Sequence, residues 1–221
     1  MSPTPDSGVA AQLREIHERI ATAARGAGRA PEAIELVAVS KEVDAAAVAA
    51  ARAAGQRAFG ENRAQELSAK AEALHAQELD LVWHFIGRLQ RNKVKSIASL
   101  VALWQSVDRS DLGVEIARHA PGARVLVQVN VAGEAQKGGC PPAELPALVD
   151  SLTDLGLTVE GLMTVPPLVG DPRPHFAALR DLSNRLGLAT LSMGMSGDFE
   201  AAIAEGSTLV RIGRAVFGPR S

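Results

Sequence analysis

Short apolar, β-branched runs alternate along the chain with helical patterns, which is typical of parallel β/α folds. An N-terminal helix comes first, because Leu13, Ile16, Ile20 and Ala24 repeat at helical spacing on one face. The apolar runs that follow have the length of single strands. We predict eight strands, at residues 34–40, 57–60, 81–87, 100–107, 123–131, 158–163, 189–193 and 208–212.

Helical stretches separate these runs, which favours parallel strands joined by right-handed crossovers. Several runs are apolar almost throughout, as expected for strands covered on both faces. The expected fold is a (β/α)8 TIM barrel with an extra N-terminal helix, formed by residues 1–221 as one domain, and a doubly wound open sheet is the alternative. The predicted helices cover residues 44–54, 64–76, 89–98, 112–120, 143–153, 175–186 and 199–204.

Polar residues lie at the ends of the predicted strands, where the active sites of this fold are built. We therefore expect these residues to converge at one end of the barrel. In chain order they are Ser40 and Lys41, then Glu61 and Asn62, His84 and Gly87, Asp108 and Arg109, Gln128 and Asn130, Met163 and Thr164, residues 192–197, and Arg211 with residues 212–214.

Lys41 directly follows an apolar strand, so its amine can be partly desolvated and reactive toward an aldehyde, or it can be an ordinary surface lysine. Ser192, Ser196 and Gly197 lie in a loop suited to an anion such as phosphate, although an ordinary Gly-Ser turn has the same composition. Barrels of this fold often bind phosphate with the loops after strands seven and eight. Arg211, Gly213 and Arg214 would supply the second loop.

Two further features leave alternatives open. His84, between Trp83 and Phe85, is either a packed core histidine or a ligand contact. The loop at residues 133–142, with Lys137, is either a flap or a solvated connection. No zinc-type spacing of His or Cys predicts a metal site.

Composition narrows the classes of function. The formal charge of -2 offers no general basic field for nucleic acid or an anionic membrane. The single cysteine, Cys140, cannot form an intrachain disulfide, and no apolar stretch reaches membrane-spanning length. We expect a cytoplasmic protein.

Several motifs together resemble one known family, the pyridoxal-phosphate homeostasis proteins, over almost the whole chain. They are Leu36-Val37-Ala38-Val39-Ser40-Lys41, Gly60-Glu61-Asn62, Trp83-His84-Phe85-Ile86-Gly87 with Leu89-Gln90 and Asn92-Lys93, Gln128-Val129-Asn130, Gly161-Leu162-Met163, residues 192–196, Gly206-Ser207-Thr208 and Val210-Arg211-Ile212-Gly213. One departure is Arg63-Ala64, where many relatives are expected to carry an aromatic and a β-branched residue, and it affects the rim of the pocket.

The resemblance implies a barrel similar to the N-terminal domain of alanine racemases, of the PLP fold-type III kind, with pyridoxal 5'-phosphate (PLP) as cofactor. It implies that Lys41 forms a Schiff base with PLP and that Arg211 faces the pyridine nitrogen. It assigns further cofactor contacts to Asn62, His84 and Met163 at the ring and to Ser196, Gly213 and Arg214 at the phosphate. Ser192, Met193 and Gly197 are included among the expected cofactor contacts because they lie in the loop suited to an anion.

Together with the residues, the resemblance favours a carrier or buffer of PLP with little or no turnover. Apo PLP-dependent enzymes would be its partners, and the chain would be a monomer. A PLP-dependent racemase-like enzyme is the alternative, but the chain has no tyrosine to act as a second base, and we expect no second domain after residue 217. An aldolase-like sugar-phosphate enzyme with Lys41 as its amine is a third class.

Overall fold

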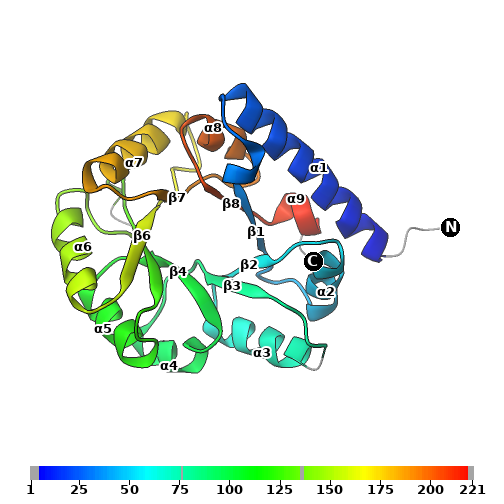
Figure 1. Cartoon of the computed structure of the whole chain (residues 1–221), viewed down its shortest axis with the longest axis horizontal. Coiled ribbons are helices and arrows are strands. Elements are labelled where there is room, and N and C mark those ends of the chain that lie inside the picture. Colours follow the sequence, from blue (N-terminus) through cyan, green and yellow to red (C-terminus); the bar gives the residue numbers. More distant parts are fainter. Residues whose placement is uncertain (1–4, 76, 135–136, 219–221) are drawn as a thin grey trace.

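The computed structural model describes residues 5–75, 77–134 and 137–218, and its centre is a closed barrel of parallel strands (Figure 1). Each strand pairs with the next one in the chain, and the last strand closes onto the first, with Leu209 opposite Glu35. The predicted TIM barrel is therefore confirmed, and the open sheet is wrong. The strands are β1 (Glu35–Val39), β2 (Ala58–Glu61), β3 (Val82–Phe85), β4 (Val101–Val107), β5 (Arg124–Gln128), β6 (Thr158–Met163), β7 (Thr190–Ser192) and β8 (Leu209–Ile212).

Helices surround the barrel, and the first one is the extra helix that the sequence predicts. Helix α1 packs against α2, α8 and α9 beside the closure of β8 onto β1 (Figure 1). Arg19 fixes this contact, since its guanidinium binds Glu200 and lies 4.8 Å from the centre of the Phe199 ring. The helices are α1 (Pro5–Gly26), α2 (Ala45–Ala53), α3 (Ala64–His75), α4 (Val94–Ile97), α5 (Ser110–His119), α6 (Leu145–Asp154), α7 (Arg173–Leu186), α8 (Phe199–Ala204) and α9 (Arg214–Phe217).

Two of these helices differ from the sequence prediction. The helix predicted at residues 89–98 is wrong at its start, because Gln90 is extended and Leu89 buries its side chain in the core. A 3-10 turn (Arg91–Lys93) and the short α4 take its place. Helix α9, directly after β8, was not predicted. The predicted end of α3 at residue 76 lies outside the described residues.

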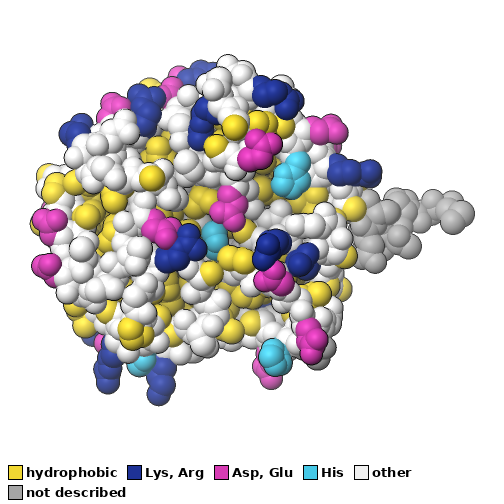
Figure 2. Space-filling view, viewed as in Figure 1, with side chains coloured by type: hydrophobic (Ala, Val, Ile, Leu, Met, Phe, Trp, Pro, Cys, Tyr) yellow, Lys and Arg dark blue, Asp and Glu magenta, His cyan; other side chains and the backbone are white. Residues whose placement is uncertain are grey.

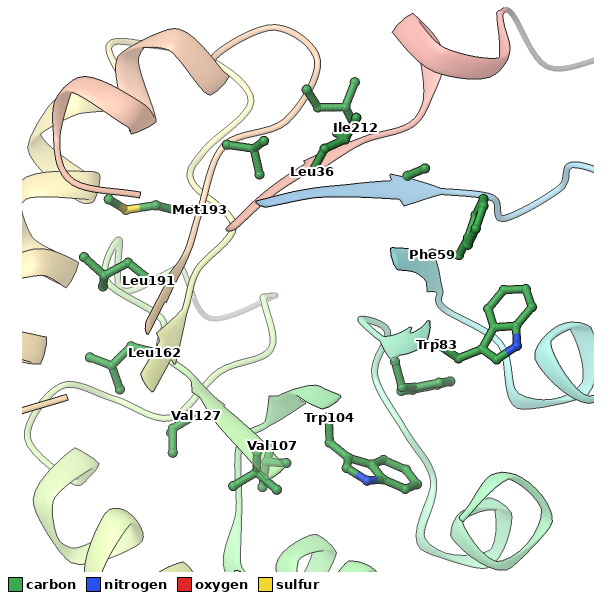
Figure 3. Close-up of a cluster of buried hydrophobic side chains, with 14 of the residues drawn as sticks. Leu36, Phe59, Trp83, Trp104, Val107, Val127, Leu162, Leu191, Met193 and Ile212 are labelled. Carbon is green, nitrogen blue, oxygen red and sulfur yellow. The ribbon is translucent and has the colours of Figure 1, made fainter. Parts of the chain in front are cut away.

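The strands bury both faces, which explains their nearly continuous apolar sequences. Alternate side chains, such as Leu36, Phe59, Trp83 and Met193, point outward into a cluster between the strands and the helices (Figure 3). The residues between them point inward. The inner apolar cluster, which occupies part of the barrel interior, consists of Val37, Ala58, Leu103, Leu126, Met163 and Leu209.

Candidate functional site

A cavity of about 640 Å³ lies at the carboxyl ends of the strands. Its walls come from the loops after β1, β2, β3, β6, β7 and β8, so residues distant in sequence meet there. This is the end of the barrel at which the fold places its active sites. The predicted site residues that line it are Lys41, Asn62, Ser196, Gly197, Arg211, Gly213 and Arg214.

Four predicted site residues do not line this cavity. His84 and Ser192 point into the barrel and belong to a buried polar network described below. Met163 lies in the inner apolar cluster. The side chain of Met193 lies in the outer cluster, because alternation along the chain turns it away from Ser192 (Figure 3).

Lys41 lies two residues after the end of β1 and is half-buried at the cavity wall. Within the described part of the chain its amine has no hydrogen bond and no ion pair. A lysine amine that is partly covered and unpaired is available to a ligand entering the cavity.

A buried ion cluster fixes the backbone on both sides of Lys41. Lys70 of α3, 6% exposed, donates to the backbone oxygen of Ser40 and to Glu61 Oε1 at 2.7 Å. Ser40 Oγ donates to the same Glu61 oxygen at 2.6 Å. Burial raises the pKa of Glu61, while the hydrogen bonds from Lys70 and Ser40 oppose the rise.

Glu66 completes this cluster on the far side of Lys41. Its Oε1 accepts from Lys70 Nζ at 2.8 Å and from the backbone N–H of Glu42, which adopts a left-handed φ of 61°. The carboxylate therefore holds a backbone conformation that a non-glycine residue rarely adopts. Residues Ser40, Glu61, Glu66 and Lys70, hereafter the lysine clamp, fix the segment that carries Lys41.

A second polar network lies inside the barrel and ends at Arg211, which is 4% exposed. Arg211 donates to Ser192 Oγ at 2.5 Å and to the backbone oxygen of Thr164 at 2.8 Å. It forms no ion pair among the described residues. Burial lowers the pKa of Arg211 to about 10, an effect that the charge of Asp198 partly offsets, so the side chain remains a cation at neutral pH.

The network continues from Ser192 to Gln105 and His84. Ser192 Oγ donates to Gln105 Oε1 at 2.6 Å, and Gln105 Nε2 lies 2.8 Å from His84 Nδ1. Burial lowers the pKa of His84 to about 4, so the ring is neutral at pH 7. An amide N–H donates to Nδ1 only when that nitrogen is unprotonated, which places the ring proton on Nε2. His84 thus packs inside the barrel, as one of its two sequence interpretations predicted.

Asn62 brings an unsatisfied acceptor to the cavity. Its Oδ1 is buried and has no hydrogen-bond partner among the residues that the structure describes. The loop approaches very closely here, since a Cβ on Gly87 would lie 2.2 Å from the backbone oxygen of Asn62. Glycine at position 87 is therefore needed to hold Asn62 at the wall, where a ligand donor would satisfy it.

The loop after β7 presents Ser196 and Gly197 to the cavity. Asp198 Oδ1 accepts from the backbone N–H of Met195 at 2.6 Å, which shapes the turn. Gly194 has a φ of 96°, and a Cβ there would lie 2.6 Å from that of Ala202. The Ser196 hydroxyl has no partner among the described residues, which leaves it free for an anion.

Sequence reasoning missed Gln105 and Lys70. Gln105 was hidden within an apolar strand, and only its inward alternation marked it. Lys70 follows Glu66 by four residues, a helical ion-pair spacing that is usually found on exposed surfaces. Lys137 was noted in a flap or solvated loop, and its amine donates to the backbone oxygen of Pro166 at 2.8 Å, which ties the two loops together.

The fold and this site define a barrel of the alanine racemase N-terminal type. The family model described as "Alanine racemase, N-terminal domain" matches residues 12–221. Known structures agree with the match. A protein of unknown function from Bifidobacterium adolescentis superposes with a TM-score of 0.90 at 36% identity, covering 98% of this chain and 97% of that one.

Comparison with curated relatives identifies the family of the chain more closely. The Pyridoxal phosphate homeostasis protein of Pseudomonas aeruginosa is 46% identical, with 97% of this chain and 96% of the relative covered. The protein of that name from Escherichia coli K12 is 40% identical, covering 96% and 97%. The chain belongs to the pyridoxal phosphate homeostasis protein family.

One solved relative shows a ligand. PipY of Synechococcus elongatus, solved with PLP bound, has a TM-score of 0.82 at 34% identity and covers 95% of this chain and 100% of its own. A lysine/ornithine decarboxylase from Vibrio vulnificus has a TM-score of 0.66 at 13% identity, and this likeness concerns the fold alone.

Proposed function

We propose that this chain binds PLP at Lys41 and acts as a carrier or buffer of the cofactor, with little or no turnover. One observation carries the proposal. The unpaired amine of Lys41 and the cation of Arg211, which has no ion pair among the described residues, line the same cavity. A ligand with an aldehyde at one end of a ring and an acceptor nitrogen elsewhere on it satisfies both groups.

The remaining wall fits the rest of PLP. Ser196 and the backbone at Gly197, Gly213 and Arg214 supply donors for a phosphate group. The orphaned Oδ1 of Asn62 accepts a hydrogen bond from a ring hydroxyl. The solved relative with PLP bound, 34% identical over 95% of this chain, supports the assignment.

The chemistry of these residues favours holding the cofactor over using it. When bound, PLP supplies an aldehyde that reacts reversibly with an amine and a ring that can withdraw electrons. Arg211 donates hydrogen bonds and accepts none, so a pyridine nitrogen beside it stays unprotonated. The ring is then a weak electron sink, which disfavours carbanion chemistry.

A PLP-dependent racemase-like enzyme is the second candidate, favoured by the match to the alanine racemase N-terminal domain. The chain contains no tyrosine, so a second base of that kind is absent from the sequence. Exchange of an amino acid's α-proton with deuterium in D₂O separates the candidates. Exchange that disappears in Lys41→Ala would establish the enzyme, and no exchange above that of free PLP supports the carrier.

Binding is tested by titrating the purified protein with PLP and recording its visible absorption spectrum. The wild type should develop a protein-bound band with one equivalent of PLP, and Lys41→Ala should not. Lys95→Ala, which removes an exposed lysine of α4, serves as the matched control. An unchanged band in Lys41→Ala would refute the proposed site.

The carrier proposal also concerns place and partners. Within the described residues no helix has the length and apolar character needed to cross a membrane. A single cysteine, buried and with its thiol pKa raised to about 11 by burial, suits a reducing compartment, and we place the role in the cytoplasm.

Apo PLP-dependent enzymes are the proposed recipients, and the monomer is the proposed carrier. Mixing the PLP-loaded protein with such an apoenzyme should restore the activity of the apoenzyme faster than PLP is released from the loaded protein into solution.

A further inference from the structure

A second cavity, of about 580 Å³, adjoins the proposed cofactor cavity and shares Asn62 with it. The loops after β2, β3 and β4 form its walls. Nothing in the proposed PLP site uses these loops beyond Asn62, Ile86 and Gly87.

The charged side chains that line this second cavity, hereafter the basic cavity, are all cations. Arg63, Arg88, Lys93 and Arg109 line it, and no Asp or Glu does. Arg109 is compensated by Asp108 at 2.6 Å and by Asp111 at 2.9 Å. The other three cations are not compensated in this way.

Arg63 lies 4.0 Å from Glu42, a distance at which exposed charges interact weakly, and its charge also helps to lower the pKa of Glu66. Arg88 and Lys93 form no ion pair among the described residues. Since the chain as a whole carries a charge of -2, this concentration of cations is a local feature.

Neighbouring surface shows the opposite pattern. The adjacent cavity of about 560 Å³ is lined by Arg91 and Arg109 together with Asp111 and Glu115, so its charges balance. The face seen in Figure 2 also carries Lys and Arg side chains interspersed with Asp and Glu. The basic cavity therefore differs from this balanced neighbour in having cations and no acid in its lining.

We propose that the basic cavity binds the phosphate group of a small phosphomonoester. Arginine offers a planar fork of donors that matches phosphate oxygens, and lysine adds a point charge. Arg63 and Arg88 come from adjacent loops and Lys93 from the turn before α4, so one phosphate can meet donors from more than one side. Lys41 is not part of this cavity, and the inference is independent of the proposed PLP binding.

The test is a titration of the ¹⁵N-labelled full chain with inorganic phosphate, followed by amide chemical shifts at constant ionic strength. We expect two groups of shifts with separate saturation curves. One group covers residues 63–65 and 88–93 at the basic cavity, and the other covers residues 196–197 and 213–214 at the cofactor cavity.

Variants assign the first group to its cations. Arg88→Gln with Lys93→Gln should weaken that binding by roughly tenfold or more, because each hydrogen bond between charged groups is worth about that factor. The second group should stay unchanged. Arg91→Gln, in the balanced neighbouring cavity, is the matched control and should shift the affinity by less than about twofold.

Two results would overturn the inference: phosphate that shifts only the amides of the cofactor cavity, and a double variant that titrates like the wild type. The amide spectrum itself reports whether the double variant is folded. If it is not, Arg63→Gln, which changes an exposed side chain, replaces it with the same expected weakening at the first group alone.

Discussion

Two cations are buried next to the cofactor cavity, and they differ in whether a carboxylate pairs with them. Lys70, 6% exposed, lies outside the barrel wall with two carboxylates at 2.7 and 2.8 Å. Arg211, 4% exposed, lies inside the barrel with a hydroxyl and a backbone oxygen as its partners and no carboxylate. A buried charge without a counterion is costly unless another interaction compensates it.

This difference in partners indicates a structural role for Lys70 and a ligand-binding role for Arg211. The lysine clamp satisfies its cation within the chain, so its role is to hold the segment around Lys41 in place. Arg211 keeps its charge at the edge of a cavity, where a ligand acceptor can compensate it. Removing Lys70 should therefore damage the fold, and removing Arg211 should chiefly damage binding.

The largest effect is expected from Lys70→Met, which leaves Glu61 buried without its cation. Breaking a buried ion pair from one side costs about 3–5 kcal/mol, and we expect that loss in the free energy of unfolding measured by urea titration. Arg57→Met is the control, because its pair with Asp80 is about 60% exposed and is worth at most about 1 kcal/mol. A Lys70→Met variant no less stable than Arg57→Met would show that the clamp does not hold the fold.

Acid should act on the network of Arg211 through His84. The pKa of His84 is about 4 in the folded protein and near 6.5 in the unfolded chain, so the unfolded state binds more protons between these values. Stability should fall as the pH drops from about 6.5 to about 4, by up to about 3 kcal/mol from this residue, and this contribution should stay constant below pH 4.

Two histidine variants isolate the contribution of His84 to the pH dependence of stability. His84→Gln should lose this part of the pH dependence, measured as unfolding midpoints between pH 4 and 7. His75→Gln, which changes an exposed histidine, should keep the wild-type profile. Parallel profiles for the wild type and His84→Gln would mean that the ring does not stay neutral inside the barrel.

A smaller effect, and one on binding, is expected from Arg211→Met. The variant removes a costly buried charge together with two hydrogen bonds, so the free energy of unfolding should change by less than about 2 kcal/mol. PLP affinity should fall roughly 10- to 100-fold, since a hydrogen bond from a charged group is worth about 1.5–3 kcal/mol. Unchanged affinity for PLP, measured by absorption titration, would remove Arg211 from the site.

The barrel itself was predictable, because strand-length apolar runs and helical patterns alternate along the whole chain. The positions of Lys41, Asn62 and Arg211 at the cavity also followed, since strand ends converge in this fold. The direction of Met193 was within reach, because the alternation that turns Ser192 inward turns Met193 outward. Its inclusion among the site residues rested on its place in the predicted anion-binding loop at residues 192–197.

The two polar networks were harder to predict from the sequence. The burial of Lys70 depends on how α3 packs against β2, which no local pattern records. Likewise, the partnership of Gln105 with Ser192 joins β4 to β7 across the barrel interior, 87 positions apart in the chain. The late start of α4 depends on Leu89 entering the core. Each of these features is set by tertiary contact and not by local propensity.

PLP binding at Lys41 is best tested by loading the protein with PLP, reducing it with borohydride and locating the modified lysine by peptide mass. We expect modification at Lys41, the unpaired amine of the cavity, and none at Lys70, whose amine is bound to Ser40, Glu61 and Glu66. A protein that retains no PLP after reduction, or retains it on another lysine while Lys41 stays unmodified, would refute Lys41 as the PLP-binding residue.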